Sequence, residues 1–389
     1  MKEWKEYRLD KLGVLERGRS RHRPRYAFHL YGGKYPFIQT GDVREAQKYI
    51  TQYSQTYSDA GLAQSKIWPK DTLCITIAAN IAELGILSFD SCFPDSVLGF
   101  IPDPNMADLD FIYYTLIHFQ KELKHIGEGS VQDNINLGTF QDVLFPIPPP
   151  PEQKAIASVL SSLDDKIDLL HRQNATLEAM AEALFRQWFV VGAKDEWENI
   201  TVADVAILNQ QTKNKKYPYP EIQYLDTGSL TKGIIENVQY YPLRDAPSRA
   251  QRLVNHNDIL ISLVRPNQKH YGIIKNPSPN FVVSTGFCVL TCNHVNPHFL
   301  YLYLTSTEMT EFLHSVAEGS TSAYPALIPE DIARLELKRP PADKLAEFGN
   351  YADSAWEKIT QNQTQIRTLE KLRDTLLPKL MSGEVRVEC

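Results

Sequence analysis

The two halves of this 389-residue chain match each other at four places, in the same order and about 190 residues apart. The matches are a shared apolar spacing, a Tyr-Pro-x-Ile-Gln string, an Asp-x-Leu string that opens a β-like run, and a Glu-Gly-Ser string. The matched residues are 4–12 with 197–205, 35–39 with 219–223, 71–73 with 258–260, and 128–130 with 318–320. One match could arise by chance, but four in order indicate a tandem duplication, which predicts a pair of similar domains rather than a solenoid.

Each half ends in a proline-marked boundary, at 147–152 and at 339–343, and a long apolar repeat follows it. Proline suits the first turn of a helix, and Glu152 and Asp343 favour the positive end of the helix dipole. The apolar steps alternate between three and four residues, which is typical of a coiled-coil seam. The seam positions are Ile156, Leu160, Leu163, Ile167, Leu170, Asn174, Leu177, Ala181, Leu184 and Trp188, and then Leu345, Phe348, Ala352, Ala355, Ile359, Asn362, Ile366 and Leu369.

Each seam contains one asparagine, Asn174 in the first run and Asn362 in the second. If the two helices pair antiparallel with these asparagines facing each other, Trp188 lies near Phe348. A buried asparagine pair is a known way to fix the register of a coiled coil. The sequence therefore predicts an antiparallel coiled coil whose register is set by Asn174 and Asn362.

The segments before the two long runs are rich in β-branched and aromatic residues bounded by Gly, Pro and Asn. Strand-like segments occur at 71–89, 258–274 and 281–291, and shorter helices are expected at 108–124 and 297–317. The predicted fold class is α+β, with two similar mixed α/β domains separated by two long helices in a pseudo-two-fold tandem repeat. The predicted boundaries are 1–150 for the first domain, 151–191 for the central helix, 192–340 for the second domain and 341–389 for the C-terminal helix.

The composition, with 43% hydrophobic and 23% charged residues, is that of a folded protein. The most apolar stretch, 73–89, contains Asn80 and Glu83 and is shorter than the roughly 20 residues that span a membrane. Residues 1–6 lack the apolar core of a signal peptide, so we expect a cytoplasmic protein. The five cysteines include no Cys-x-x-Cys pair, and neither a disulfide scaffold nor a metal site is expected.

Motifs of the common catalytic classes are missing from the sequence. It contains no P-loop, no His-Glu-x-x-His, no Gly-x-Ser-x-Gly and no zinc-deaminase signature. We therefore predict a binding protein, without catalytic residues or metal ligands. Missing motifs do not exclude a nuclease with a diffuse carboxylate–lysine site, which magnesium-dependent cleavage by the purified chain would reveal.

Local charge and side-chain type indicate DNA as the ligand. The net charge is −6, but residues 1–51 hold twelve Lys or Arg against six Asp or Glu, and binding responds to local potential. Arginine suits phosphates and guanine, glutamine and asparagine amides pair with adenine, and polar residues after a glycine suit phosphates. The candidate DNA-binding residues are Arg17, Arg19, Arg21, Arg23, Arg25, Gln39, Ser130, Gln132, Lys213, Lys215, Lys216, Gln223, Arg265, Asn267, Gln268, Lys269, Ser320 and Thr321. Each segment alone could be a solvated surface, and matching candidates in both halves favour DNA.

Three segments resemble the specificity subunit of type I restriction-modification systems. Residues 148–157 (PPPPEQKAIA) are similar to the start of that family's central helix, and 184–189 (LFRQWF) to its end. Residues 372–385 (LRDTLLPKLMSGEV) are similar to its C-terminal spacer. The second helix start, at 340–344, lacks the Glu-Gln pair of the first.

The resemblance implies two target recognition domains, each reading one half of a split site in double-stranded DNA. It also implies that the long helices set the half-site spacing and dock two methyltransferase (modification) subunits. Those subunits carry S-adenosylmethionine, restriction/translocase subunits with ATP and Mg²⁺ join the full complex, and this chain binds no cofactor. The alternative is a non-catalytic coiled-coil scaffold that holds two protein-binding domains, and binding of duplex DNA separates the two readings.

Overall fold

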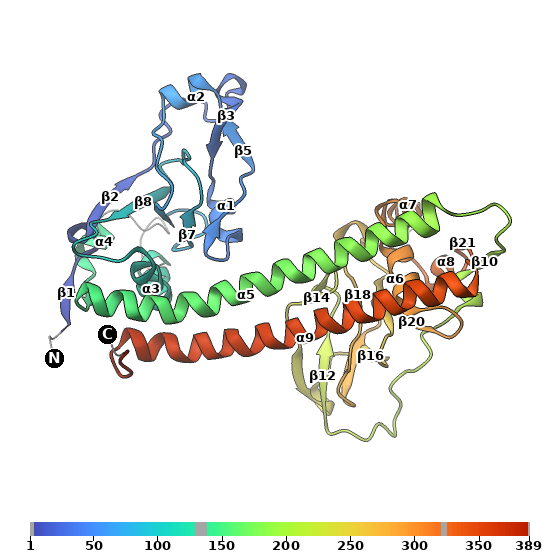
Figure 1. Ribbon diagram of the computed structural model, residues 1–389. Helices are drawn as coiled ribbons and strands as arrows, with labels where there is room; N and C mark the ends of the chain where they lie inside the picture. Colours follow the sequence, from blue (N-terminus) through green and yellow to red (C-terminus); the bar gives the residue numbers. More distant parts are fainter. Residues whose placement is uncertain (1–3, 129–137, 320–324, 388–389) are drawn as a thin grey trace. The chain divides into compact units, whose positions relative to one another are not determined.

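The computed structural model describes residues 4–128, 138–319 and 325–387. Its contacts divide the chain into unit 1, made of Met1–Leu170 and Gln365–Cys389, and unit 2, made of His171–Thr364. Two long helices, α5 (Pro150–Phe185) and α9 (Ala342–Met381), contribute residues to both units (Figure 1). Within the described ranges, none of the helices has an apolar stretch that could span a lipid bilayer.

Unit 1 is built on a five-stranded sheet with two small strand pairs beside it. Its strands are β1 (Lys5–Tyr7), β2 (Gly13–Arg17), β3 (Tyr31–Phe37), β4 (Tyr49–Ile50), β5 (Gln55–Tyr57), β6 (Leu73–Thr76), β7 (Leu84–Leu87), β8 (Val97–Pro102) and β9 (Phe145–Ile147). The sheet order is β2-β8-β6-β7-β4, and neighbours are antiparallel except β4 and β7. Strands β6 and β7 are buried along their whole length, so the sheet is covered on both faces.

Helices complete the core of unit 1. They are α1 (Thr40–Glu45), α2 (Asp59–Ala63), α3 (Leu109–Glu128) and α4 (Thr139–Asp142), with the 3-10 turns η1 (Leu9–Lys11) and η2 (Phe28–Leu30). Ile75 and Phe100 of the sheet lie in one apolar cluster with Phe111 of α3 and with Ile156 and Leu160 of α5. The start of α5 is therefore part of the core of unit 1.

The Glu152-Gln153 pair at the start of α5 is used inside unit 1. Trp4 Nε1 donates a hydrogen bond to Glu152 Oε1 at 3.2 Å. Gln153 is fully buried, and its Nε2 donates to the carbonyl of Met106 while its Oε1 accepts from the backbone N–H of Asp108. Gln153 therefore fixes the start of α5 to the loop before α3, and Glu152 fixes it to Trp4 near the start of β1. Helix α9 begins without such a pair, so the motif serves these contacts rather than helix formation.

Unit 2 has two four-stranded sheets, with the orders β11-β20-β17-β18 and β15-β12-β19-β16, and the pairs β10–β21 and β13–β14. The strands are β10 (Asn199–Thr201), β11 (Ala206–Leu208), β12 (Glu221–Leu225), β13 (Leu230–Thr231), β14 (Ile234–Ile235), β15 (Gln239–Pro242), β16 (Ala250–Leu253), β17 (Ile259–Ser262), β18 (Tyr271–Ile273), β19 (Phe281–Ser284), β20 (Phe287–Cys292) and β21 (Glu336–Lys338). The helical elements are the π-helical η3 (Arg186–Val191), the 3-10 turns η4 (Val202–Asp204), η5 (Leu243–Asp245) and η6 (Pro266–Gln268), and the helices α6 (Pro297–Thr305), α7 (Thr307–Glu318) and α8 (Pro329–Ala333).

The fold confirms the duplication predicted from the sequence. In each unit a short antiparallel pair joins the first strand to the last, β1 with β9 and β10 with β21. The order β2-β8-β6-β7 in unit 1 corresponds to β11-β20-β17-β18 in unit 2. The matched strings at 71–73 and 258–260 open β6 and β17, and residues 128 and 318 end α3 and α7. Each unit combines helices and strands, as the α+β class requires.

One of the four sequence matches diverges in structure at its last residue. The backbone N–H of Gln39 donates to Asp42 Oδ2 at 2.7 Å, at the start of α1. Gln223 instead continues β12, where its Nε2 donates to Asn280 Oδ1 at 3.3 Å. The expectation that these glutamines hold equivalent places is wrong, because unit 1 turns into a helix where unit 2 continues a strand.

The two shorter helices predicted from the sequence are present, with one difference. The helix expected at 108–124 is α3, and the helix expected at 297–317 is two helices, α6 and α7. Ser306 separates them because its backbone is extended and its Oγ accepts a hydrogen bond from the N–H of Met309.

Within unit 1, the start of α5 packs against the end of α9. Ile167 and Leu170 of α5 form a buried cluster with Ile366, against which Leu369 packs. Arg373 Nη1 donates to Asp164 Oδ1 at 2.9 Å. Residue numbers rise along one helix as they fall along the other, so the two segments run antiparallel.

Within unit 2, the end of α5 and η3 pack against the start of α9, again antiparallel. Asn362 Nδ2 donates to Asn174 Oδ1 at 2.8 Å, and both side chains are buried. The rings of Trp188 and Phe348 lie 6.4 Å apart between their centroids. These are the two contacts that the apolar spacing predicts.

Candidate nucleic-acid interface

The arginine-rich segment of unit 1, residues 17–28, starts at the last residue of β2, leads toward β3 and lies on the surface. Its exposed side chains include those of Arg17, Arg19, Arg21, Arg23 and Arg25. The backbone of the segment is tied to the loop after α2. Ser65 Oγ donates to the carbonyl of Arg19 at 2.8 Å, and the N–H of His22 donates to Gln64 Oε1 at 2.9 Å. The segment therefore has a fixed course although its side chains face solvent.

Two of these arginines lie against an acidic side chain of the same unit. Arg25 Nη2 donates to Asp95 Oδ1 at 2.8 Å and to Asp95 Oδ2 at 3.0 Å. Arg23 Nη2 lies 3.9 Å from the same carboxylate. Arg23 and Arg25 therefore help to shape the segment, and the first three arginines of the run are its best candidates for phosphate contact.

In unit 2, the loop between β17 and β18 presents four polar side chains from a constrained backbone. Arg265 and Lys269 have φ values of 48° and 58°, in the left-handed region, and they flank η6. Such a backbone persists in residues other than glycine only where the surrounding structure holds it. Pro266 is buried, whereas Arg265, Asn267 and Gln268 are exposed and Lys269 is half-buried.

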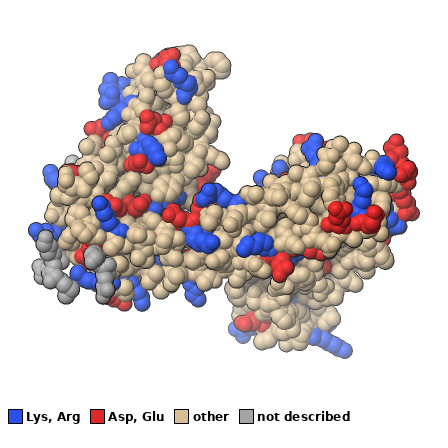
Figure 2. All heavy atoms as spheres, viewed as in Figure 1, with Lys and Arg blue, Asp and Glu red and all other residues tan. Residues whose placement is uncertain are grey.

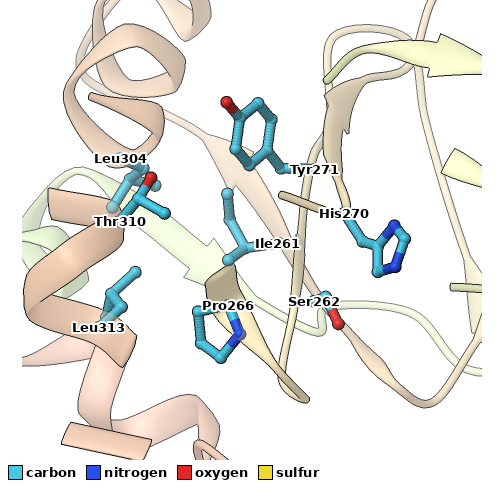
Figure 3. Close-up of a pocket in the computed structure, with 8 residues that line it drawn as sticks. All are labelled: Ile261, Ser262, Pro266, His270, Tyr271, Leu304, Thr310 and Leu313. Carbon is cyan, nitrogen blue, oxygen red and sulfur yellow. The ribbon is translucent and has the colours of Figure 1, made fainter. Parts of the chain in front are cut away.

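The space beneath this loop is a packing gap rather than a ligand pocket. Leu304, Thr310 and Leu313 of α6 and α7 line one side, as Figure 3 shows. Pro266 lines another side, and the ring of His270 points away from the helices (Figure 3). The volume is about 10 Å³, which is room for about one water molecule. Any large ligand of this loop has to bind on its outer surface.

The lysine-rich segment of unit 2 connects β11 to β12. Lys215 and Lys216 are exposed, and Lys213 is half-buried with its backbone N–H donating to the carbonyl of Gln251 at 2.7 Å. Strand β2 of unit 1 corresponds to β11 of unit 2. The arginine-rich segment follows β2, and the lysine-rich segment follows β11. The fold thus puts the two basic segments at corresponding positions of the two units.

The remaining candidates are less exposed or not described. Gln39 and Gln223 are half-buried. Ser130, Gln132, Ser320 and Thr321 lie outside the described residues. On the face drawn in Figure 2, Lys and Arg side chains lie among Asp and Glu side chains along the long helices. The loops are therefore better candidates for base reading than the part of the helices that this face shows.

Sequence reasoning missed a buried polar network in unit 2. His298 of α6 is fully buried, and its Nδ1 lies 2.8 Å from Asp353 Oδ1 on α9. Lys275, which follows β18, places Nζ 2.7 Å from His298 Nε2. Since Lys275 donates to Nε2, the histidine proton sits on Nδ1 and points to the carboxylate. The sequence contains no signal for the network because its members are 23 and 55 residues from His298.

This network makes the stability of unit 2 depend on pH. Burial, followed by the charge of Lys275, holds the pKa of His298 far below its usual range, while Asp353 raises it and His256 lowers it. As pH falls below about 6.5, His298 becomes protonated in the unfolded chain while it stays neutral in the folded protein. Protonation therefore favours the unfolded state, so the stabilisation by neutral His298 is full above this pH and is lost as pH falls below it. We expect the unfolding free-energy gap between the wild type and His298→Gln to shrink by about 1 kcal/mol from pH 7.5 to 5.5. Urea unfolding at both pH values measures it, and an unchanged gap contradicts the assignment.

Comparison with known proteins agrees with this architecture. The family model described as the type I restriction modification DNA specificity domain matches residues 1–179 and again residues 194–373. The chain is 27% identical to the type I restriction enzyme MjaIX specificity subunit of Methanocaldococcus jannaschii, covering 92% of this chain and 88% of that protein. It is 27% identical to the HindI specificity subunit of Haemophilus influenzae, over 46% of this chain and 40% of that one.

A solved structure has the same fold. The crystal structure of the type I restriction-modification S subunit from M. genitalium aligns with a TM-score of 0.63 at 18% identity, covering 97% of this chain and 96% of that chain. The two matches of the family model each cover most of one long helix and the strands and helices before it. The chain therefore belongs to the family of type I restriction-modification DNA specificity subunits.

Proposed function

We propose that each of the two domains reads one half of a bipartite DNA site on behalf of a type I restriction-modification complex. The observation that carries this proposal is the duplication of one α+β fold with a basic, exposed segment at the corresponding place in each copy. In this reading, residues 1–150 and 192–340 are the target recognition domains. Their arginines and lysines contact phosphates, and the amides of the loops contact base edges.

We further propose that α5 and α9 form an antiparallel coiled coil that sets the distance between the half-sites. The buried hydrogen bond between Asn174 and Asn362 supports this, because a single polar pair in an apolar seam disfavours other registers. We assign the docking of two methyltransferase subunits to the exposed faces of these helices, because Lys and Arg alternate with Asp and Glu on the face drawn in Figure 2 and give no continuous positive surface for DNA. S-adenosylmethionine, ATP and Mg²⁺ then belong to the partner subunits, and this chain supplies specificity alone.

The experiment that tests the proposal is a genome-wide map of adenine methylation. Cells carry the cognate methyltransferase subunit with or without this chain. The expected result is a split motif that appears only when this chain is present. If the methyltransferase is expressed and bound to this chain but methylation does not change, the proposal fails and the chain is a protein scaffold.

A further inference from the structure

Two aromatic side chains project from the arginine-rich segment of unit 1. Tyr26 is 84% exposed and Phe28 is 95% exposed, the latter at the start of η2. Among the large apolar side chains of the described residues, Phe28 is the most exposed. Aromatic residues usually lie in the core or in an interface, so two of them standing out next to arginines indicate a surface that is covered in a complex.

The backbone beneath these aromatic side chains is anchored on both sides. Tyr31 Oη donates to the carbonyl of Arg25 at 2.9 Å, and Ser58 Oγ donates to the carbonyl of His29 at 2.7 Å. Leu30, which follows, is buried in the core between β3 and β5. Tyr26 and Phe28 therefore start from a fixed position, and little backbone entropy is lost when they meet a ligand.

The charge next to them matches a polyanion. Arg17, Arg19 and Arg21 are exposed and precede Tyr26 in the same segment. Aromatic side chains combined with arginines suit nucleic acid, where the cations hold phosphates and the rings contact unstacked bases. Protein interfaces are also enriched in aromatic residues and arginine, so a protein partner is the alternative that the test below separates from DNA.

We propose that Phe28, two residues after the exposed Tyr26, is a wedge that inserts at a base step of the half-site read by unit 1. The insertion unstacks the step and favours flexible pyrimidine–purine steps, so the wedge selects sequence through deformability. This inference rests on the proposed DNA-reading function, and it adds a specific side chain and a specific mode of reading.

The test uses the complex of this chain with its methyltransferase subunits. The DNA is a duplex that contains the motif found by the methylation map. The fluorescent base 2-aminopurine is placed in turn at each step of the half-site. We expect one position other than the target adenine, which the methyltransferase itself flips out, to brighten with the wild type and to stay dark with Phe28→Ala. We also expect Phe28→Ala to weaken specific binding about fivefold to 150-fold, the range of one lost base–aromatic stack. The salt dependence should not change, because no charge is removed.

Three variants make the outcome interpretable. Phe28→Leu keeps an apolar wedge and should retain part of the fluorescence signal. Arg19→Ala should reduce the salt slope by about one and keep the bright position. Phe312→Ala, which truncates a phenylalanine of α7 that is 51% exposed, should bind like the wild type.

Each contrary outcome has a distinct meaning. If the wild-type complex has no sequence-specific affinity, the proposed function itself fails. If the wild type binds and Phe28→Ala matches it in affinity and fluorescence, the wedge is wrong while the DNA-reading function stands. If Phe28→Ala instead prevents assembly with the methyltransferase subunits, the rings belong to a protein interface and the wedge is overturned.

Discussion

Exchange of residues 196–341 for the corresponding segment of a relative is expected to replace one half of the methylated motif and leave the other half intact. The ends of this segment are joined, because β10 pairs with β21 and the N–H of Arg339 donates to the carbonyl of Glu198 at 2.9 Å. A segment with adjacent ends can be exchanged without changing the path of the flanking chain. Sequencing of methylated adenines in cells with each variant measures the result.

The exchange of residues 5–147 is the matched control. Its ends are joined in the same way, by β1 and β9, with Lys5 opposite Ile147. It should replace the half of the motif that the first exchange leaves intact. A single exchange that alters both halves together would falsify the assignment of one half-site to each domain.

The repeat and the long helices were predictable because they depend on local patterns. The alternating apolar steps predicted both long helices. The same spacing predicted the contact between Asn174 and Asn362. The strands β6 and β17 were predictable because they lie in segments rich in β-branched and aromatic residues. Such features depend on residues close in sequence, where propensity and periodicity act directly.

The details of the site depend on tertiary contacts that no local pattern contains. Asp95, which binds Arg25, is 70 residues away from it, and sequence alone treats the five arginines as equal. Phe28 would ordinarily be counted as a core residue, and only the fold shows that it faces solvent. Gln39 matched Gln223 in sequence, but the following residues form a helix in one unit and a strand in the other.

The His298 network also could not be predicted from the sequence. Most histidine, lysine and aspartate side chains lie on protein surfaces. Nothing in the sequence distinguishes His298 from the other histidines among the ten. The network forms because α6, α9 and the segment after β18 meet in unit 2. Its burial lowers the pKa of Lys275 to about 8, a shift that cannot be inferred without the fold.

Replacement of Phe348 by alanine is expected to destabilise unit 2 by about 3–5 kcal/mol. Phe348 is fully buried, and its ring lies 5.2 Å from that of Phe189 and 6.2 Å from that of Phe185. Phe299 of α6 lies 4.9 Å from Phe189, so the cluster connects α9 to η3 and to the core of unit 2. Removal of one ring leaves a cavity that the surrounding rigid elements cannot close.

The cost should appear as a fall of about 6–20 °C in the melting temperature of unit 2, measured by scanning calorimetry of the whole chain. Val190→Ala is the matched control, because Val190 lies in η3 but is 56% exposed, and its truncation should change stability by less than about 0.5 kcal/mol. A melting temperature of Phe348→Ala that equals that of the control would mean that the aromatic cluster does not hold α9 to unit 2. The helix pair sets half-site spacing only if it is fixed to the domain. Destabilisation by Phe348→Ala should therefore also reduce methylation at the split motif, whereas Val190→Ala should leave methylation unchanged.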